Sequence, residues 1–308
     1  MVKKYKFKRN LKYDLKRGSL LYLLLSLPVL YFIIFKYIPM YGVTVAFKEY
    51  NIFQGILKSP WIGFKYFKEI FSMSEFHRAL RNTLILNFLD LIFGFPAPII
   101  LALLLNEIRI KWYKRTSQTL LYLPYFLSWV IIGGMMLQLF SAHTGIINLF
   151  IKAIGLKPIP FLTNKWIWIG TYVMVGVWQS AGWGTIIYLA AIAGINQELY
   201  EAATVDGAGK IQQIWHITLP CIRQTIIILL ILNLGRILTI GFERPYIIGN
   251  QYVVNFSDVI STFVYRVGLQ SMRFSLATAV GLFQSFVGMI FLLTSNFLAN
   301  KFGEHGIW

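Results

Sequence analysis

Long apolar runs alternate with shorter polar segments along the whole chain. A helix needs about 20 mostly apolar residues to cross a hydrocarbon core about 30 Å thick. Six segments have that length and character: Leu20–Tyr37, Thr83–Leu105, Leu120–Phe140, Ile167–Ala193, Ile222–Ile240 and Leu276–Leu298. The pattern therefore predicts an all-α membrane protein whose six transmembrane helices form one domain over residues 20–300.

Two of these segments have unusual features. The first follows a basic region, as a secretory signal does, but it is too long and no small-residue cleavage site follows it. We interpret it as an uncleaved membrane anchor. The fourth is interrupted by Gln179, Ser180, Gly182 and Gly184.

Composition supports a membrane class. Of 308 residues, 57% are hydrophobic and 13% charged, against roughly 25% charged in a soluble domain. The formal charge of +17 would be typical of a protein that binds nucleic acid. Eight of the basic residues, however, precede the first apolar run, where they indicate the orientation of the chain in the membrane, so we predict no nucleic-acid partner. Cys221 stands alone and the four histidines lack ligand spacing, so we predict no metal site.

The distribution of Lys and Arg predicts the orientation of the helices. Eight lie in the tail 1–19 and four in the segment 106–117, so both belong in the cytoplasm. An even number of spans returns the tail 301–308 to the same side. The segments 39–82, 141–166 and 241–275 then lie outside. The first of them is also rich in Lys and Arg, so the cytoplasmic segments differ from it in the density of basic residues rather than in their absolute number.

The loop 194–221 is predicted to be cytoplasmic yet carries a single basic residue, Lys210. Asn196 is a suitable N-cap for a short helix, and Gly207 with Gly209 would end it. Pro220 then marks entry into the fifth span. An ordinary interfacial helix that links two spans would satisfy the same spacing.

Three blocks in this loop resemble the EAA loop of the permease subunits of type I ATP-binding-cassette (ABC) importers. They are Glu201-Ala202-Ala203, Asp206-Gly207-Ala208 and Ile217-x-Leu219-Pro220. The resemblance implies a MetI-like fold and a coupling helix that docks on a cytoplasmic ATPase subunit through the residues of these blocks. One departure is Gln224, where many relatives have a second proline, and it concerns where the fifth span starts.

Motifs elsewhere resemble the sugar-permease branch of these binding-protein-dependent importers, in particular members for oligosaccharides and polysaccharide fragments. They are Ile38–Gly42, Ala46–Asn51, Ser59–Gly63, Arg81–Thr83 and Leu123-Pro124. The resemblance implies a bacterial cytoplasmic membrane, a second homologous permease, two ATPase subunits and an external binding protein. The chain has no Gly-x-x-x-x-Gly-Lys-Ser/Thr motif, so we expect no enzyme activity here, and ATP and magnesium only in the partner ATPases.

Polar side chains within the spans are the candidates for a substrate pathway, because a polar group in a span must face a cavity or a partner. They are Asn87, Asp90, Trp178, Gln179, Trp183, Asn233, Arg236 and Gln284. Aromatic faces and amides suit sugar rings, and Trp178-Gln179 is the strongest single candidate. The alternative is that these groups hydrogen-bond helix to helix or lie in a permease dimer interface.

The outer segments 39–82 and 141–166 carry nine Lys and Arg against three Glu, a net charge of +6. This charge suits docking of a binding protein, contact with lipid headgroups, or attraction of an acidic, uronic-acid oligosaccharide.

A different function class is a secondary transporter or channel without ATPase partners. It predicts paired charges in the spans and inverted repeats, and the sequence displays neither. A membrane-embedded enzyme would need His and carboxylates clustered at one depth, which the sequence also lacks.

Overall fold

The computed structural model describes residues 18–301 and 306, and in this range the chain is helical, with one isolated antiparallel bridge between Lys48 and Trp61. The basic part of the predicted tail 1–19 and most of the predicted tail 301–308 lie outside the described residues.

The first half of the described chain contains helices up to a sharp break near residue 127. They are α2 (Ser19–Phe32), the π-helix η1 (Ile33–Tyr37), α3 (Ile38–Met40), the 3-10 helix η2 (Tyr41–Phe47), α4 (Gly55–Lys58), α5 (Lys65–Ser72), α6 (Ser74–Leu89), the π-helix η3 (Asp90–Gly94), α7 (Pro96–Glu107), α8 (Lys111–Tyr122) and the 3-10 helix η4 (Leu123–Phe126).

The second half continues to the C-terminal end. Its helices are α9 (Trp129–Phe140), α10 (Ile146–Ala153), α11 (Lys165–Ala193), α12 (Gln197–Val205), α13 (Lys210–Gln213), the π-helix η5 (Ile214–Thr218), α14 (Leu219–Gly235), α15 (Glu243–Ile248), α16 (Val254–Ser257), α17 (Ile260–Tyr265), the π-helix η6 (Arg266–Gln270) and α18 (Phe274–Lys301).

Five of the six predicted spans are confirmed as continuous helices that are long and apolar enough to cross a membrane. They are Ser19–Phe47, Ser74–Glu107, Lys165–Ala193, Lys210–Gly235 and Phe274–Lys301. The continuous helix of the fifth span starts at Lys210 rather than near Ile222, and its part α14 begins at Leu219 with Pro220 in the first turn, as predicted. A proline is tolerated there because a π-helical segment precedes it.

The third predicted span, Leu120–Phe140, is not one straight helix. The segments Lys111–Phe126 and Trp129–Phe140 meet at an angle of 100°. Pro124 sits in the 3-10 turn that ends the first segment, and Ser128 caps the second by accepting a hydrogen bond from the backbone N–H of Ile131. A proline followed by a capping serine breaks a helix although both sides are apolar. The length of the apolar run alone therefore merged two helices into one predicted span.

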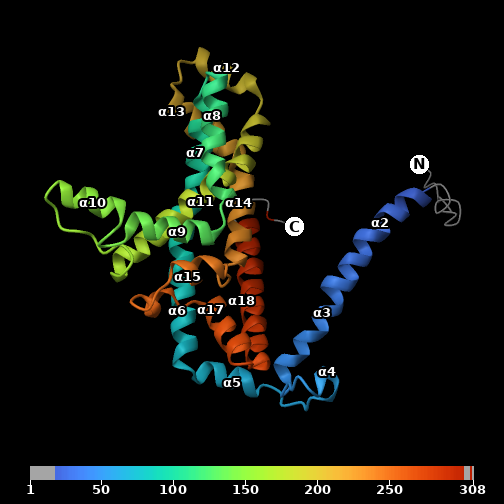
Figure 1. Ribbon diagram of the computed structural model, residues 1–308. Helices are drawn as coiled ribbons and strands as arrows, with labels where there is room; N and C mark the ends of the chain where they lie inside the picture. Colours follow the sequence, from blue (N-terminus) through green and yellow to red (C-terminus); the bar gives the residue numbers. More distant parts are fainter. Residues whose placement is uncertain (1–17, 302–305, 307–308) are drawn as a thin grey trace, which may run out of the picture.

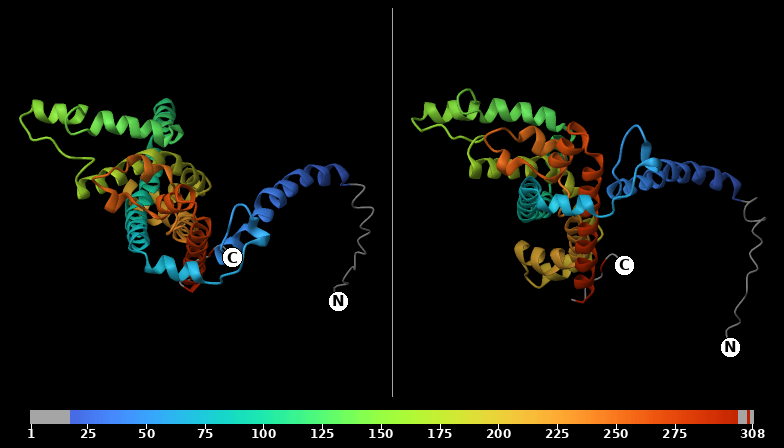
Figure 2. Two further views of the ribbon diagram at one scale, coloured as in Figure 1. Left: turned by 60° about the horizontal axis from the view of Figure 1, so that its bottom comes forward. Right: turned by 90° about the horizontal axis from the view of Figure 1, so that it is seen from below.

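The long helices form an upright bundle, and the first span stands away from it as an arm (Figures 1 and 2). The arm, Ser19–Phe47, has no buried residue in its most apolar window. Only its end, η2, packs against the bundle, on α18. On the opposite side, α9 and α10 extend outward.

Three buried apolar clusters hold the bundle together. One joins α9, α11 and α15 around Trp168 and Tyr172. A second joins α5, α6, α17 and α18 around Phe76 and Phe263. The third packs α7, α11 and α14 near α12, around Tyr188. Within a bilayer, helices are held together by close packing of such side chains rather than by removal of apolar surface from water, so these clusters fix the framework that positions the polar groups.

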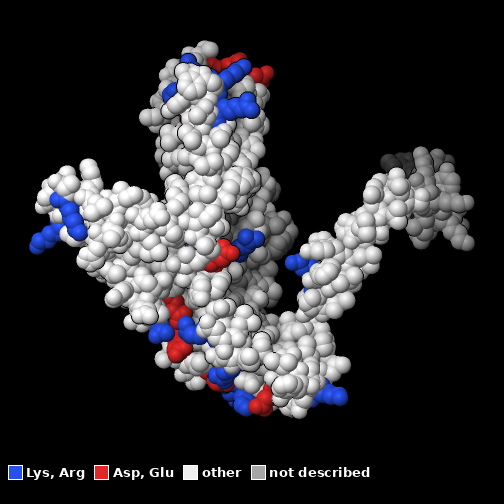
Figure 3. Space-filling model, viewed as in Figure 1, with Lys and Arg blue, Asp and Glu red and all other residues white. Residues whose placement is uncertain are grey.

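Charged side chains gather near the two ends of the bundle, with a small group of both signs at mid-height (Figure 3). The end that carries α12 and the opposite end near α5 are thus distinct from the apolar middle. This distribution suits a protein whose middle lies in hydrocarbon.

Candidate functional site

The first candidate region is α12, at one end of the bundle (Figure 1). The Asn196 side chain accepts a hydrogen bond from the Glu198 N–H at 3.1 Å, which caps the helix as predicted. The helix ends at Val205, and Gly207 follows with φ +81°, a backbone conformation that side chains other than glycine rarely adopt. The predicted short helix with a glycine stop is therefore confirmed.

Hydrogen bonds tie α12 to the start of the fifth span. The hydroxyls of Tyr200 and Thr218 lie 2.9 Å apart, and buried Gln213 donates to the Thr204 hydroxyl at 2.9 Å. Lys210 forms an ion pair of 3.2 Å with Glu107 at the end of α7. A displacement of α12 would therefore be passed to two long helices.

The residues of the EAA-like blocks divide into two groups by exposure. Glu201, Ala202, Asp206, Gly207 and Pro220 are exposed, whereas Ala203, Ala208, Ile217 and Leu219 are half-buried. Ile217 and Leu219 pack against the apolar cluster beneath α12. The exposed group forms an outward surface, and the half-buried group attaches that surface to the bundle.

Unlike an ordinary solvated loop, the region around α12 exposes large apolar side chains. Val205 is 88% exposed, Ile211 73% and Trp215 65%. A surface of this kind suits contact with another protein.

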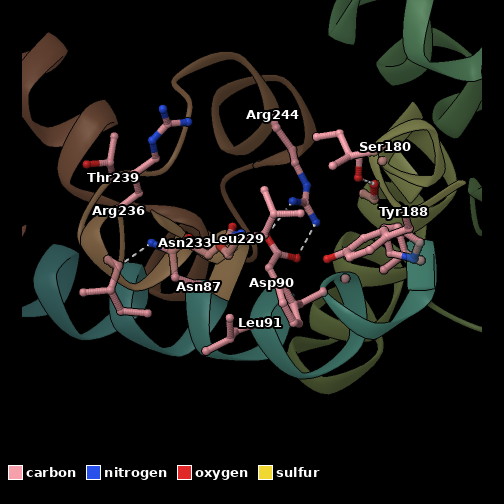
Figure 4. A pocket seen from close by; sticks show the side chains of 18 residues that line it. Asn87, Asp90, Leu91, Ser180, Tyr188, Leu229, Asn233, Arg236, Thr239 and Arg244 are labelled. Carbon is pink, nitrogen blue, oxygen red and sulfur yellow. Dashed lines mark hydrogen bonds and ion pairs between the residues drawn. The ribbon is translucent and has the colours of Figure 1, made fainter. Parts of the chain in front are cut away.

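The second candidate region is a cavity of about 390 Å³ at mid-height in the bundle (Figure 4). Four of the predicted pathway residues line it: Asn87, Asp90, Asn233 and Arg236. Asn87 donates a 2.6 Å hydrogen bond to the Ile237 carbonyl, and Asn233 donates to the Leu229 carbonyl at 2.8 Å. Their side-chain oxygens remain as acceptors.

Arg244 is a charged residue of this cavity that the sequence analysis did not single out. Its guanidinium binds both carboxylate oxygens of Asp90, at 2.7 and 3.1 Å, and donates to the Tyr172 carbonyl at 2.6 Å. It also lies 3.7 Å from the centre of the Tyr172 ring. Gly176 leaves room for it, because a Cβ there would displace the guanidinium from this position. The sequence analysis found no paired charges within the predicted spans, and this pair joins Asp90 of the second span to a residue of the segment 241–275, which was predicted to lie outside.

The other predicted pathway residues do not line this cavity. Gln179 lies within 3.4 Å of the Tyr125 carbonyl, and Trp183 stacks on the Tyr125 ring with centroids 4.7 Å apart. Trp178 is 46% exposed, and Gln284 donates to the Leu238 carbonyl at 2.7 Å. The structure thus brings together four of the candidates, Asn87, Asp90, Asn233 and Arg236, and places the other four elsewhere.

Comparison with known proteins identifies the family. Residues 76–303 match the family described as binding-protein-dependent transport system inner membrane component. The chain belongs to this family. It is a multi-pass membrane permease subunit, not an enzyme, and the match spans every confirmed long helix except the arm.

Similar proteins cover nearly the whole permease. Protein LplB of Bacillus subtilis (strain 168) is 49% identical, over 96% of this chain and 92% of its own. The polygalacturonan/rhamnogalacturonan transport system permease protein YteP of the same organism is 45% identical, over 100% and 96%. A crystal structure of a bacterial ABC transporter involved in the import of the acidic polysaccharide alginate contains a chain 43% identical, with a TM-score of 0.87, covering 95% of this chain and 99% of that one.

A second solved structure widens the comparison. It is the bacterial alginate ABC transporter in complex with an alginate pentasaccharide-bound periplasmic protein, with a chain 42% identical, a TM-score of 0.87 and coverage of 96% and 99%. The all-α fold predicted from the sequence is confirmed by these likenesses and by the helices of the structure.

The end of the bundle near α5, opposite α12, holds an ion-pair cluster that sequence reasoning missed. Buried Asp258 accepts from Arg266 at 2.9 and 3.0 Å and from Arg78 at 3.3 Å. The hydrogen bond to Asp258 raises the pKa of the Arg266 guanidinium. Asn82, within the Arg81–Thr83 motif, donates to the carbonyls of Asn255 and Asp258 at 2.9 and 2.8 Å. That motif therefore holds the segment 255–260 against α6.

Proposed function

We propose that this permease forms, with a second homologous permease, the membrane pathway of an ATP-driven oligosaccharide importer. An external binding protein delivers the sugar, and two ATPase subunits on the cytoplasmic side hold ATP and magnesium. The tails 1–19 and 301–308 and the loop 194–221 face the cytoplasm of a bacterial cell, and the segments 39–82, 141–166 and 241–275 face outward. The cargo is an acidic oligosaccharide.

The observation that carries the proposal is similarity along almost the entire chain to a permease of an importer of acidic polysaccharide. At 43% identity over 95% of the chain, the likeness includes the arm, the bundle and α12. A second relative, YteP, is named for the transport of galacturonan, which is also built from uronic acids.

The arrangement of α12 supports coupling to an ATPase. The helix is capped by Asn196, and its Tyr200 hydroxyl lies at hydrogen-bond distance from Thr218 of the fifth span, whose first residue, Lys210, forms an ion pair with Glu107 of the second span. An ATPase subunit that moves α12 would therefore move the fifth and second spans together. An alternating-access mechanism requires that movement of the ATPase subunits is passed on to the membrane-spanning helices in this way.

The arm supports a second permease. An apolar helix of membrane length with no buried residue in its most apolar window packs on the bundle only through η2. Such an apolar helix can contact lipid with one face and pack against a partner permease with the other.

The outer end supports an acidic cargo. A surface cleft of about 900 Å³ is lined by four groups that are basic or can become so, His77, Arg78, Arg81 and Lys165, and by no carboxylate among the described residues. Five lysines of the predicted outer segments are exposed: Lys58, Lys65, Lys68, Lys152 and Lys157. Lys48 does not belong to this set, because it is buried and donates to the Ile56 carbonyl. A basic mouth raises the local concentration of an anionic sugar.

One observation favours a secondary transporter instead. The Asp90–Arg244 pair is the paired charge that such a protein would need. Three hydrogen bonds hold Arg244 in place, however, and the pair contains one carboxylate, which suits a structural contact better than a proton relay.

The test is reconstitution in proteoliposomes. We expect uptake of a uronic-acid oligosaccharide only when a second permease, the ATPase pair, the binding protein and ATP are all present. The purified chain alone should hydrolyse no ATP. Uptake driven by a proton gradient without ATP would favour the secondary transporter, and ATP turnover by the isolated chain would refute the assignment of hydrolysis to partners.

A further inference from the structure

We propose that Arg236 binds a sugar carboxylate at mid-height in the permease and so selects acidic oligosaccharides. This inference rests on the proposed function and names the residue that would discriminate between cargoes. The cavity that Arg236 lines has three charged residues, Asp90, Arg236 and Arg244, for a net charge of +1.

The position of Arg236 is unusual for a charged side chain. The helix Lys210–Gly235 ends directly before it, and α15 begins only at Glu243. α15 lies beside the middle of the bundle rather than at an end (Figure 1). Non-helical backbone at membrane depth is tolerated only where it is enclosed by protein or lines a water-filled cavity. An arginine at such a break is therefore positioned to meet a solute.

The second arginine of the cavity is already occupied. Arg244 binds both oxygens of Asp90 and the Tyr172 carbonyl through its two terminal nitrogens, so its charge is already paired with a carboxylate. Arg236 differs, because no described residue forms an ion pair or a side-chain hydrogen bond with it. Figure 4 shows the Arg236 side chain extended and separate from the Arg244–Asp90 pair. The positive charge that remains in the cavity is thus that of Arg236.

The groups around Arg236 suit the rest of a sugar acid. The amides of Asn87 and Asn233 donate to backbone carbonyls, so their oxygens can accept hydrogen bonds from sugar hydroxyls. Thr239 also lines the cavity and offers a hydroxyl. A guanidinium that binds a carboxylate through two parallel hydrogen bonds, beside acceptors for hydroxyls, matches a uronic-acid unit.

The experiment compares two sugars of the same length and linkage in the complete reconstituted importer. One is a uronic-acid trisaccharide, and the other is the same trisaccharide with its carboxyl groups reduced to alcohols. The variants are Arg236→Gln and Arg236→Lys, and the control is Lys301→Gln, which removes a positive charge at the exposed end of α18. Uptake of each sugar is expressed as a ratio to the wild type, so that selection by the binding protein cancels.

We expect Arg236→Gln to lower uptake of the acidic sugar about tenfold or more, since charge-assisted hydrogen bonds contribute at that level. Uptake of the reduced sugar should stay within about twofold of the wild type. Arg236→Lys keeps the charge but not the two parallel hydrogen bonds, so it should lose less acidic uptake than Arg236→Gln without reaching the wild-type level. Lys301→Gln should change neither sugar.

Three results would overturn the assignment. They are unchanged acidic uptake in Arg236→Gln, an equal loss for both sugars at normal membrane abundance, or a loss in Arg236→Lys as large as in Arg236→Gln. If the wild-type importer takes up neither sugar, the proposed function itself fails, which separates the two claims.

Discussion

The α12 end and the mid-height cavity of this permease are built in opposite ways. The α12 surface comes from one continuous stretch, residues 196–220, and its cap, helix and glycine stop follow each other along the chain. The cavity is assembled from distant segments, and its ion pair joins residues 154 positions apart. A local site can be recognised from spacing, whereas a site assembled by packing is recognised only from the packed structure. The two regions should also fail differently when they are mutated.

The largest expected effect is on the stability of the cavity. Asp90→Ala leaves the largely buried Arg244 guanidinium without its carboxylate, and we expect a loss of about 3 kcal/mol in the free energy of unfolding. The double variant Asp90→Ala/Arg244→Met should recover most of that loss, because it removes the unpaired charge as well.

Thermal unfolding in detergent and membrane abundance measure both variants. A single variant as stable as the wild type would mean that the pair does not stabilise the bundle. A double variant no better than the single one would mean that Asp90 acts through something other than Arg244.

At the α12 end we expect a loss of function without a loss of protein. Gly207→Val forces a branched side chain into the φ +81° conformation, at a cost of about 1–2 kcal/mol confined to the loop. Glu201→Lys reverses a charge on the exposed surface. Both variants should insert normally, yet their uptake should fall well below that of the wild type while the ATPase pair still hydrolyses ATP.

The matched control is Gly194→Ala, where φ is −82° and a Cβ would meet only ordinary contacts, the nearest at 3.5 Å. Its uptake should equal that of the wild type. Normal uptake at normal abundance in both Gly207→Val and Glu201→Lys would reduce α12 to a linker.

Much of the fold was predictable from apolar length. Five long helices are where the hydropathy pattern predicts them, including the fourth span despite its polar interruptions. Length could not reveal the 100° bend, since Leu127 and its neighbours are apolar on both sides of the break. The bend depends on Pro124 and on the Ser128 cap, whose local signals are weaker than the hydropathy of the run.

The candidate site was predictable only in part. Four polar residues of the predicted spans share a cavity, Asn87, Asp90, Asn233 and Arg236, but Arg244 comes from a segment predicted to lie outside. Its helix, α15, folds back beside the middle of the bundle, and no periodicity in six residues could predict that return. Trp178 and Gln179 had the more sugar-like composition, yet they do not line the cavity.

The smallest expected effect concerns the outer lysines. Neutralising Lys58, Lys65, Lys68, Lys152 and Lys157 together should lower acidic-sugar uptake about threefold at low salt, because exposed charges act weakly and through solvent. The difference should vanish at high salt, where screening shortens the range of these charges. Competition by neutral and uronic-acid oligosaccharides of equal length separates capture of the cargo from docking of the binding protein. Equal competition by the neutral sugar would assign the charge to docking or lipid contact.

The most direct test of the contrast between the two regions measures Glu201→Lys and Arg236→Gln side by side. Uptake of the uronic-acid trisaccharide and of its carboxyl-reduced form is measured together with ATP hydrolysis in the same proteoliposomes. Glu201→Lys should lower uptake of both sugars by one common factor, because α12 transmits force and does not touch the cargo. Arg236→Gln should change the ratio between the sugars. A changed ratio in Glu201→Lys, or a common factor in Arg236→Gln, would contradict the separation of coupling from recognition.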